Sequence, residues 1–361
     1  MTIRLSIVSI VGARPQFVKA AVMSRAIRRG HDELLLHTGQ HYDAEMSAIF
    51  FEEMGIPAPA IHLETGSGSH AQQTAAMLVG IEKALVERRP NWVVTFGDTN
   101  STLAGGLAAV KLGIPVAHVE AGLRSFNRAM PEEINRVLVD RISSALFCPS
   151  RVAVENLANE GVRDGVHLVG DVMAEAFAFA AKASSNRSRI LEQIGVEPHR
   201  YVLATVHRAE NTDDRQRLRS ILMALDAVDD IVVFPVHPRT RRALDALNHA
   251  PAPNVRLIAP AGYLDMARLI TSARLVLTDS GGLQKEAYWG GVPCVTLRGE
   301  TEWVETVAAG WNVVVGADRD RITEAVRTFA PPADHPDLYG GPGVAARCVE
   351  ILESQSALMV A

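Results

Sequence analysis

The chain has 361 residues, of which 48% are hydrophobic and 21% are charged, and its formal net charge at pH 7 is −5. This length exceeds the roughly 100–200 residues of a typical domain and predicts two domains, each with its own core. The acidic balance argues against a broad nucleic-acid surface, because proteins that bind the phosphate backbone usually carry a basic face. No apolar stretch is long enough to span a bilayer. We therefore expect a two-domain globular protein that binds neither nucleic acid nor a membrane.

The cysteines and the first residues bear on the cellular compartment. The three cysteines are far apart in the sequence, which fits neither a disulfide framework nor the paired ligands of a zinc site. The amino terminus begins with a strand-like run over residues 3–11 and lacks the basic segment and cleavage site of a signal peptide. These features predict a cytoplasmic protein with reduced thiols and no bound metal.

Short apolar runs alternate with amphipathic helical patterns along the whole chain. This rhythm predicts an α/β fold in which parallel strands are joined by crossover helices. The runs expected to form strands lie at residues 5–11, 33–37, 92–96, 116–119 and 145–148 in the first half, and at 201–206, 231–236, 255–258, 275–278, 294–297 and 313–315 in the second. We expect the first domain to span residues 1–171 and the second residues 172–344, with a helical connection over 175–200.

Ligands of open α/β sheets lie beyond the carboxyl ends of the strands, and two such domains facing each other would hold a ligand in the cleft between them. The first predicted strand leads into Gly12, Arg14 and Pro15, with Lys19 about one turn into the following helix. A glycine turn, a helix amino terminus and two basic residues are typical of an anion site. The alternative is a tight turn followed by a solvated basic helix face.

Acidic residues follow several of the predicted strands. Asp98 comes after the run at 92–96, Glu120 directly follows the run at 116–119, and Glu132 stands in the first turn of a helix that begins at Pro131. Each acid taken alone could cap a helix or interact favourably with its dipole. Acids grouped at one edge of a sheet are what an acid/base site needs, so we interpret the set as catalytic.

In the second half, the run at 201–206 leads directly into His207 and Arg208, and we interpret His207 as functional and His237, after the next run, as structural. A further run ends in Ser280-Gly281-Gly282, whose backbone N–H groups could bind phosphate, and Glu286 one turn later could accept hydrogen bonds from a ribose diol. A plain strand-to-helix turn would also tolerate two glycines. The chain lacks a G-x-G-x-x-G fingerprint on its first strand and a P-loop, so neither a dinucleotide cofactor nor NTP hydrolysis is indicated.

These segments, in this order, resemble the non-hydrolysing UDP-N-acetylglucosamine 2-epimerase family. The resemblance extends over nearly the whole chain. The motifs that carry it are Gly12-Ala13-Arg14-Pro15, Gly39-Gln40-His41, Gly97-Asp98-Thr99, Val119-Glu120-Ala121-Gly122-Leu123-Arg124, Pro131-Glu132-Glu133, His207-Arg208 and Asp279-Ser280-Gly281-Gly282.

The resemblance implies two Rossmann-like domains facing a cleft, as in glycosyltransferase-B folds, with a final helix at about 345–361 returning to the first domain. It also implies a homodimer, no cofactor, and interconversion of UDP-GlcNAc and UDP-ManNAc through a 2-acetamidoglucal. The residues implied in proton transfer are Asp98, Glu120 and Glu132, with His207 near the reacting groups. Those implied in UDP or substrate binding are Arg14, Lys19, Arg124, Arg136, His207, Ser280, Gly281, Gly282 and Glu286.

The sequence departs from the family pattern at three places. Many members have Thr-Glu-Arg-Pro where this chain has Thr301-Glu302-Trp303-Val304, so an aromatic residue replaces a basic contact. Residues 40–43 lack the polar pattern with which bacterial members bind a second, activating UDP-sugar. Residues 14–17 and 125–128 look closer to a branch that acts on UDP-2,3-diacetamido-glucuronate, whose extra carboxylate could pair with Arg124 or Arg128.

Three other functions are alternatives, and the residues separate the hydrolysing epimerase from the main interpretation only poorly. A UDP-sugar-dependent glycosyltransferase would need no base at carbon 2, a hydrolysing epimerase would release the free sugar and UDP, and a sensor would bind the UDP-sugar without turnover. Product analysis separates the first two from the epimerase, and intact acids at all three positions disfavour the sensor.

Overall fold

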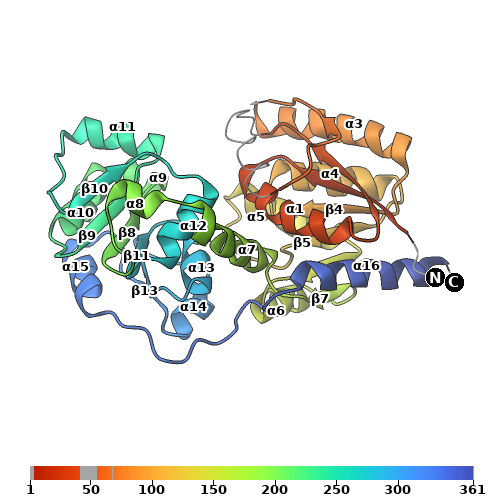
Figure 1. Cartoon of the computed structure of the whole chain (residues 1–361). Coiled ribbons are helices and arrows are strands. Elements are labelled where there is room, and N and C mark those ends of the chain that lie inside the picture. Colours follow the sequence, from red (N-terminus) through yellow and green to blue (C-terminus); the bar gives the residue numbers. More distant parts are fainter. Residues whose placement is uncertain (1–3, 41–54, 67, 361) are drawn as a thin grey trace. The chain divides into compact units, whose positions relative to one another are not determined.

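The computed structural model describes residues 4–40, 55–66 and 68–360, and the chain divides into two compact units (Figure 1). Unit 1 contains Met1–Ala176 and Tyr339–Ala361, and unit 2 contains Phe177–Leu338. The division falls within the helix α7 (Val172–Arg187), and the last helix, α16 (Val344–Val360), belongs to unit 1. The chain therefore leaves unit 1 once and returns to it at its end.

Unit 1 is built around a parallel sheet of seven strands in the order β3-β2-β1-β4-β5-β6-β7. Successive strands run outward in one direction from β1 to β3 and in the other from β4 to β7, so the winding reverses between β1 and β4. This reversal is a topological switch point, where ligands of open α/β sheets bind. The strands are β1 (Ser6–Val11), β2 (Asp32–His37), β3 (Ile61–His62), β4 (Trp92–Phe96), β5 (Val116–Val119), β6 (Ala145–Cys148) and β7 (Val166–Leu168).

Helices cover both faces of this sheet, which explains why the central strands are continuous apolar runs. α3 packs on α4 and α4 on α5 along one face, while α1 packs on α16. Trp92, fully buried in β4, donates a hydrogen bond to Ser356 of α16 (2.7 Å), which ties the returning helix to the sheet. The other helices of unit 1 are α1 (Arg14–Ile27), α3 (His70–Arg88), α4 (Asn100–Lys111), α5 (Pro131–Ile142) and α6 (Arg151–Asn159).

Unit 2 repeats the design with six parallel strands in the order β10-β9-β8-β11-β12-β13, and its switch point lies between β8 and β11. A separate apolar cluster fills each face of the sheet. The strands are β8 (Tyr201–Thr205), β9 (Ile231–Pro235), β10 (Val255–Ile258), β11 (Leu275–Thr278), β12 (Cys294–Thr296) and β13 (Asn312–Val314). The helices are α8 (Ile190–Ile194), α9 (Ala209–Thr212), α10 (Arg215–Asp226), α11 (Pro238–Leu247), α12 (Tyr263–Thr271), α13 (Gly281–Trp289), α14 (Val304–Ala308) and α15 (Arg319–Thr328).

The predicted α/β fold with two parallel sheets is confirmed, and each apolar run forms a strand whose ends lie within one residue of the expected ones. The strands β3 and β7 were not predicted. They have only two and three residues and stand at the two edges of the unit 1 sheet. Edge strands bury less surface than central ones and therefore carry a weaker apolar signal.

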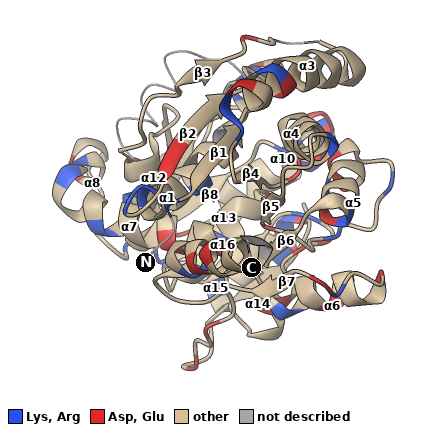
Figure 2. Ribbon diagram, turned by 90° about the vertical axis from the view of Figure 1, so that its right-hand side faces the viewer, with Lys and Arg blue, Asp and Glu red and all other residues tan. Residues whose placement is uncertain are grey.

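Charged residues of both signs are interspersed on the helices, as on α3 and α5 (Figure 2). Within the described ranges, no helix has the length and hydropathy required to cross a membrane. Among these same residues, no group of three or more His, Cys, Asp or Glu side chains is arranged to hold a metal ion.

Candidate active site

The turn after β1 is organised by Gln16, a residue that the sequence interpretation did not select. Its side-chain oxygen accepts hydrogen bonds from the N–H groups of Gly12 (2.7 Å) and Ala13 (3.0 Å), and its amide nitrogen donates to the carbonyl of Phe96 (2.7 Å). The side chain thus joins the exits of β1 and β4 across the switch point. The N–H groups of Gly12 and Ala13 are therefore already occupied by Gln16.

Gly12 itself is required for close packing. A Cβ atom at this position would collide with the hydroxyl oxygens of Ser101 and Thr38, which are themselves hydrogen-bonded to each other (2.8 Å). Arg14 opens α1, and its side chain lies outside the described part of the structure, as do residues 41–43 of the possible activator segment.

Lys19 and Glu120 form a nearly buried ion pair next to the exit of β4. Lys19 lies on α1 and Glu120 directly follows β5, and their side chains are 9% and 12% exposed. Gly97 has a φ of 62°, and a Cβ atom there would lie 3.3 Å from Lys19 Nζ and 3.5 Å from Glu120 Oε2. The pair therefore lies against the backbone immediately before Asp98.

The backbone of Glu120 is in the left-handed region, with a φ of 72°. A residue with a side chain pays about 1–3 kcal/mol for such a conformation, and residues of this kind cluster at functional sites. The N–H groups of Glu120 and Ala121 both donate to the carbonyl of Phe147 (3.1 Å each), which holds the strained turn in place.

Asp98 is ion-paired with Arg136 on α5. The same guanidinium contacts Glu133 (2.8 Å), whose carboxylate also accepts hydrogen bonds from the N–H groups of Ser125 (3.0 Å) and Phe126 (2.9 Å). Burial by itself would raise the pKa of Glu133, but the hydrogen bonds from Ser125 and Phe126 and the charge of Arg136 lower it below its usual value. Glu133 is thus a structural carboxylate that anchors the loop before α5.

The three predicted acids lie at the carboxyl edge of the unit 1 sheet. Asp98 directly follows Gly97, and a Cβ atom on Gly97 would lie 3.5 Å from Glu120 Oε2. Glu132 is exposed in the first turn of α5, the helix whose Arg136 reaches Asp98. The capping role that Asp98 could have played belongs to Thr99, whose hydroxyl accepts from the Thr102 N–H at the start of α4.

Arg124 has a different environment from the other proposed substrate-binding residues. Its side chain is 1% exposed, and it is paired with Asp140 (2.7 Å) and with both carboxylate oxygens of Glu160 (2.7 Å each). It also donates to the carbonyl of Leu123 (2.7 Å). These contacts leave almost no surface for a substrate and support a structural role for Arg124.

In unit 2, the buried carboxylate of Asp279 joins the exits of β8 and β11. It accepts hydrogen bonds from the N–H groups of His207 (3.0 Å) and Arg208 (3.0 Å) and from the side-chain amide of Asn211 (3.1 Å). Burial lowers the pKa of His207 below its usual value, the positive charges of Arg208 and Arg239 act in the same direction, and Asp279 opposes them. The half-exposed imidazole is therefore presented in its neutral form at neutral pH.

The amino terminus of α13 follows β11. Ser280 caps the helix by accepting from the Leu283 N–H (3.4 Å), and the N–H of Ser280 donates to the Thr278 hydroxyl (2.9 Å). Gly281 and Gly282 then form the first turn, where helix geometry supplies no intrahelical partner for backbone N–H groups. Such a terminus is suited to an anion.

Donor groups from two other segments approach this terminus. A Cβ atom on Gly281 would lie 3.3 Å from Trp303 Nε1, 3.7 Å from Glu302 Oε2 and 3.8 Å from Arg208 Nη2. The Lys285 ammonium lies 3.9 Å from the centroid of the Trp303 ring, a cation–π contact. The aromatic replacement noted in the sequence therefore lies beside α13 and next to a positive charge.

Two negative charges near α13 behave differently. Glu302 forms two hydrogen bonds with Arg298 (2.8 and 3.1 Å), and this pairing overcomes the effect of burial and lowers the pKa of Glu302. Burial raises the pKa of Glu286 to about 7, although a hydrogen bond from Tyr263 and the charge of Lys285 act in the opposite direction. Of the two carboxyl groups, Glu286 is the one that changes charge near neutral pH.

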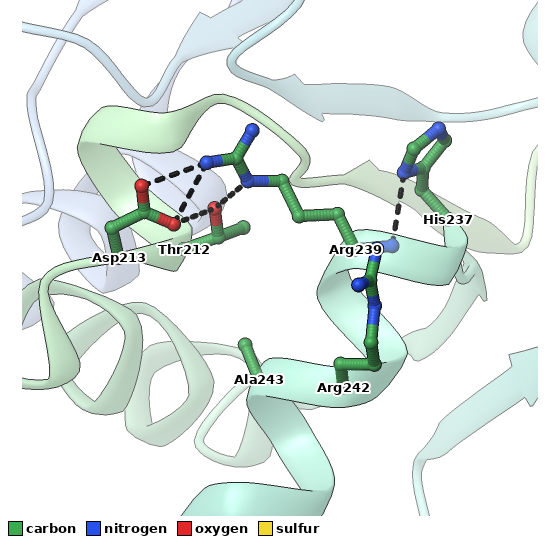
Figure 3. A pocket seen from close by; sticks show the side chains of 6 residues that line it. All are labelled: Thr212, Asp213, His237, Arg239, Arg242 and Ala243. Atoms are coloured by element: carbon green, nitrogen blue, oxygen red, sulfur yellow. Dashed lines mark hydrogen bonds and ion pairs between the residues drawn. The ribbon is translucent and has the colours of Figure 1, made fainter.

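A cavity of about 520 Å³ lies next to this region, at the exit of β9 (Figure 3). His237 accepts a hydrogen bond from the Arg239 N–H (3.2 Å) and so caps α11, in agreement with its structural interpretation. Arg239 pairs with both carboxylate oxygens of Asp213 (2.9 and 2.7 Å). The cavity is lined by Thr212, Asp213, His237, Arg239, Arg242 and Ala243.

Four residues that organise these turns escaped the sequence interpretation: Gln16, His118, Asp140 and Asn211. The sequence did contain one indication for His118. A parallel strand is covered on both faces of the sheet, so a histidine within such an apolar strand is buried and needs polar partners. Gln16, Asp140 and Asn211 form hydrogen bonds to residues distant in the sequence, and a local sequence pattern cannot predict such contacts.

Comparison with known proteins agrees with this architecture. A profile of the UDP-N-acetylglucosamine 2-epimerase family matches residues 25–353. The chain is 50% identical to the UDP-2,3-diacetamido-2,3-dideoxy-D-glucuronate 2-epimerase of Pseudomonas aeruginosa, over 96% of this chain and 99% of that protein. It is 49% identical to a UDP-N-acetylglucosamine 2-epimerase homolog of Methanococcus maripaludis, over 97% of this chain and 100% of that protein.

A crystal structure of the Methanocaldococcus jannaschii UDP-GlcNAc 2-epimerase in complex with UDP-GlcNAc and UDP matches the fold with a TM-score of 0.87, at 40% identity, covering 97% of this chain and 100% of that one. The fold is therefore the glycosyltransferase-B-like one that the resemblance implied. The chain belongs to the UDP-N-acetylglucosamine 2-epimerase family and is a UDP-sugar 2-epimerase, an isomerase.

Proposed function

We propose that this chain interconverts UDP-GlcNAc and UDP-ManNAc by eliminating UDP and adding it back, without hydrolysis. The observation that carries the proposal is that Asp98 directly follows Gly97 and the Glu120 carboxylate lies against Gly97, each acid being ion-paired with a basic side chain. Inversion of carbon 2 requires one group to remove a proton from one face of the sugar and another to deliver a proton to the opposite face. Separate carboxyl groups can perform these two tasks.

In the first half-reaction, a carboxylate removes the proton from carbon 2, and the electrons of that C–H bond form a double bond between carbons 1 and 2. UDP leaves carbon 1 with the electrons of the C–O bond, and the product is a 2-acetamidoglucal. In the second half-reaction, carbon 2 is protonated from the opposite face and a phosphate oxygen of UDP attacks carbon 1. The cycle consumes no water and needs no oxidant. We assign the proton transfers to Asp98, Glu120 and Glu132.

We assign UDP binding to the amides of Gly281 and Gly282, to Ser280 and to His207, with Arg14 and Lys19 as further diphosphate contacts. A helix amino terminus beside a guanidinium stabilises the negative charge that develops on the departing diphosphate, and such electrostatic stabilisation is usually the largest catalytic term. Glu286, one turn into α13, is assigned to the ribose hydroxyls. We assign Arg136, which is ion-paired with Asp98, to the binding of the sugar substrate.

The test is NMR spectroscopy of the purified protein with UDP-GlcNAc in heavy water. We expect UDP-ManNAc to form with one solvent deuteron at carbon 2 and with no net release of UDP. Free N-acetylmannosamine would identify a hydrolysing enzyme instead. Consumption of the UDP-sugar only after an acceptor is added would identify a glycosyltransferase.

A second candidate substrate is UDP-2,3-diacetamido-glucuronate, favoured by the 50% identity to the Pseudomonas aeruginosa enzyme. Its extra carboxylate needs a basic partner, and of the two arginines first considered, Arg124 is occupied by Asp140 and Glu160. Arg128 is exposed and lines a cavity of about 680 Å³. Parallel assays with both UDP-sugars decide between them, because the true substrate should have the much larger kcat/KM.

We also propose that the protein acts as a homodimer, as the resemblance implies. An apolar strip on unit 1 supports association, because Phe126, Ile134 and Leu138 are exposed on and before α5. Light scattering coupled to size-exclusion chromatography should give twice the chain mass of 39.0 kDa. A single-chain mass at micromolar concentration would reject the dimer.

A further inference from the structure

A buried histidine stands behind the turn that carries Asp98. His118 lies in β5 with no exposed surface, and its Nε2 atom is 2.7 Å from the carbonyl oxygen of Gly97. Its Nδ1 atom is 2.7 Å from Oδ1 of Asp140 on α5. A carbonyl oxygen can only accept, so Nε2 carries a hydrogen and donates it to Gly97.

The partner of His118 is held as a carboxylate by several donors. Asp140 accepts from the Gly122 N–H (3.1 Å) and from Arg124 (2.7 Å), and Arg124 continues to Glu160 on the cap of α6. Burial would raise the pKa of Asp140, but the hydrogen bond and charge of His118, together with those of Arg124, lower it. These contacts form a network that links β5, α5 and α6 to the exit of β4.

The hydrogen bond to Gly97 acts on a position with little stiffness of its own. Gly97 has a φ of 62°, a conformation that glycine adopts easily but does not enforce. The carbonyl that His118 holds belongs to the peptide plane shared by Gly97 and Asp98. Fixing that plane restricts the direction in which the Asp98 side chain leaves the backbone.

Another histidine in the same unit shows what a purely structural role looks like. His31 is also buried, but its Nδ1 atom accepts from the Leu5 N–H (3.3 Å) and its Nε2 atom faces Glu353 (3.0 Å). One ring hydrogen satisfies both contacts. His31 contacts no strand exit at the switch point, so it provides a matched control.

We propose that His118 is a positioning residue for the epimerisation, which acts by donating from Nε2 to the Gly97 carbonyl and so orienting Asp98 relative to Glu120. The inference rests on the proposed function of these two acids. Misplacing a reacting group by about 1 Å can reduce the rate about 100-fold, so a hydrogen bond that fixes the turn matters to turnover even though His118 touches no substrate.

Two substitutions separate the two hydrogen bonds of the ring. The amide nitrogen of glutamine can replace Nε2, so His118→Gln keeps a donor for Gly97 and loses the ion pair with Asp140. The amide nitrogen of asparagine can replace Nδ1, so His118→Asn keeps a donor for Asp140 and loses the Gly97 contact. We expect His118→Asn to lower kcat about 100-fold with KM within about 3-fold, and His118→Gln to restore kcat to within about 10-fold of the parent enzyme.

The control is His31→Asn, which we expect to lower the melting temperature without changing kcat per folded molecule. For a merely structural His118, kcat per folded molecule would stay at the parent value in both variants, or would fall equally in both, and either result overturns the proposal. If His118→Asn does not fold, the state of Nε2 decides: an Nε2–H that is hydrogen-bonded in histidine NMR spectra supports the proposal, and an Nε2 without a hydrogen rejects it.

A second measurement does not depend on activity. In protein labelled with ¹⁵N-histidine, Nε2 of His118 should carry a hydrogen that is hydrogen-bonded. An Nε2 without a hydrogen overturns the proposal. If the parent protein exchanges no carbon 2 hydrogen in any tested UDP-sugar, the proposed function fails, and the NMR result still reports on the His118 network.

Discussion

The two switch points share one strand order but are built from opposite kinds of groups. Beside the switch point of unit 1, at the exits of β4 and β5, carboxylates lie next to basic side chains, as with Asp98 next to Arg136 and Glu120 next to Lys19. At the exits of β8 and β11 in unit 2, the carboxylate of Asp279 is buried and accepts hydrogen bonds from the N–H groups of His207 and Arg208. Unit 2 instead presents hydrogen-bond donors, namely the backbone amides in the first turn of α13 and the guanidinium group of Arg208.

The same strand order can therefore support either proton transfer or anion binding. Parallel strands bring their carboxyl ends to a common edge, whatever residues follow them. Acids at that edge favour proton transfer, and amides and guanidinium groups favour anion binding. In both units, a buried side chain that touches no substrate in our proposal fixes the turns: Gln16 in unit 1 and Asp279 in unit 2.

The substitution Glu120→Gln tests the proton-transfer role assigned to unit 1 and should have the largest effect. Without the carboxylate, proton transfer at carbon 2 should fall by about 100- to 10,000-fold, while UDP binding stays within a factor of a few because its main contacts are assigned elsewhere. Deuterium incorporation measured by NMR and UDP affinity measured by calorimetry check the two halves of this prediction. Glu87→Gln, on the exposed side of α3, is the control. Unchanged turnover would remove Glu120 from the mechanism.

The corresponding test in unit 2 is Asp279→Asn. The substitution replaces one acceptor oxygen with a donor beside the N–H groups of His207 and Arg208. We expect the free energy of unfolding to fall by about 2–3 kcal/mol and UDP affinity to fall about 10-fold. Chemical denaturation and calorimetry provide the measurements. Asp230→Asn, which breaks a partly exposed pair with Arg274, should cost less than about 1 kcal/mol, and an equal loss in both variants would contradict the scaffold role of Asp279.

The carboxyl group of Glu286 in unit 2 should make the stability of the protein depend on pH. Its pKa of about 7 in the folded protein lies above the ordinary value of 4.5, so the folded state holds the proton more tightly, and stability should decrease as the pH rises from about 4.5 through 7. Glu286→Gln should remove up to about 3 kcal/mol of this decrease, visible in melting temperatures between pH 5 and 8.

Binding should respond to the same group in the opposite sense. The ionised carboxylate accepts from both ribose hydroxyls, whereas the protonated form has lost part of that capacity. UDP affinity of the parent protein should therefore weaken about 10-fold from pH 8 to pH 6, with proton release on binding near pH 7. A pH-independent affinity, or equal pH dependence in Glu286→Gln, would argue against ribose recognition by this residue.

The smallest effect concerns the choice of substrate. Arg128→Ala should raise KM for UDP-2,3-diacetamido-glucuronate about 5-fold and leave KM for UDP-GlcNAc unchanged, because only the former has a carboxylate for an exposed arginine to bind. Arg29→Ala, also exposed in unit 1, controls for the general loss of positive charge. An equal change for both sugars would separate Arg128 from carboxylate recognition.

Much of the fold could be predicted from the sequence because its signals are local. An apolar run flanked by helical patterns marks a buried parallel strand wherever it occurs, and the long central strands were found to within one residue. The same reasoning placed Asp98, Glu120 and His207 directly after strands. It failed for β3 and β7, which have three residues or fewer at the edges of the sheet.

The role of each polar residue depended on the tertiary structure. Glu132 and Glu133 are neighbours with the same chemistry, yet Glu133 is buried under donors from Ser125 and Phe126 while Glu132 is exposed. From the sequence, Arg124 and Arg128 are equally plausible partners for a substrate carboxylate. In the structure, Arg124 is paired with Asp140 and Glu160, whereas Arg128 is exposed.

The positions of strands and helices, and the residues that follow the strands, could be inferred from local sequence patterns, since periodicity and turn chemistry act over a few residues. Which charges are neutralised and which stay exposed depends on contacts formed in the folded chain. The partners of a side chain such as His118 lie about twenty residues away on either side, and the free energy of a buried charge depends on all the groups packed around it.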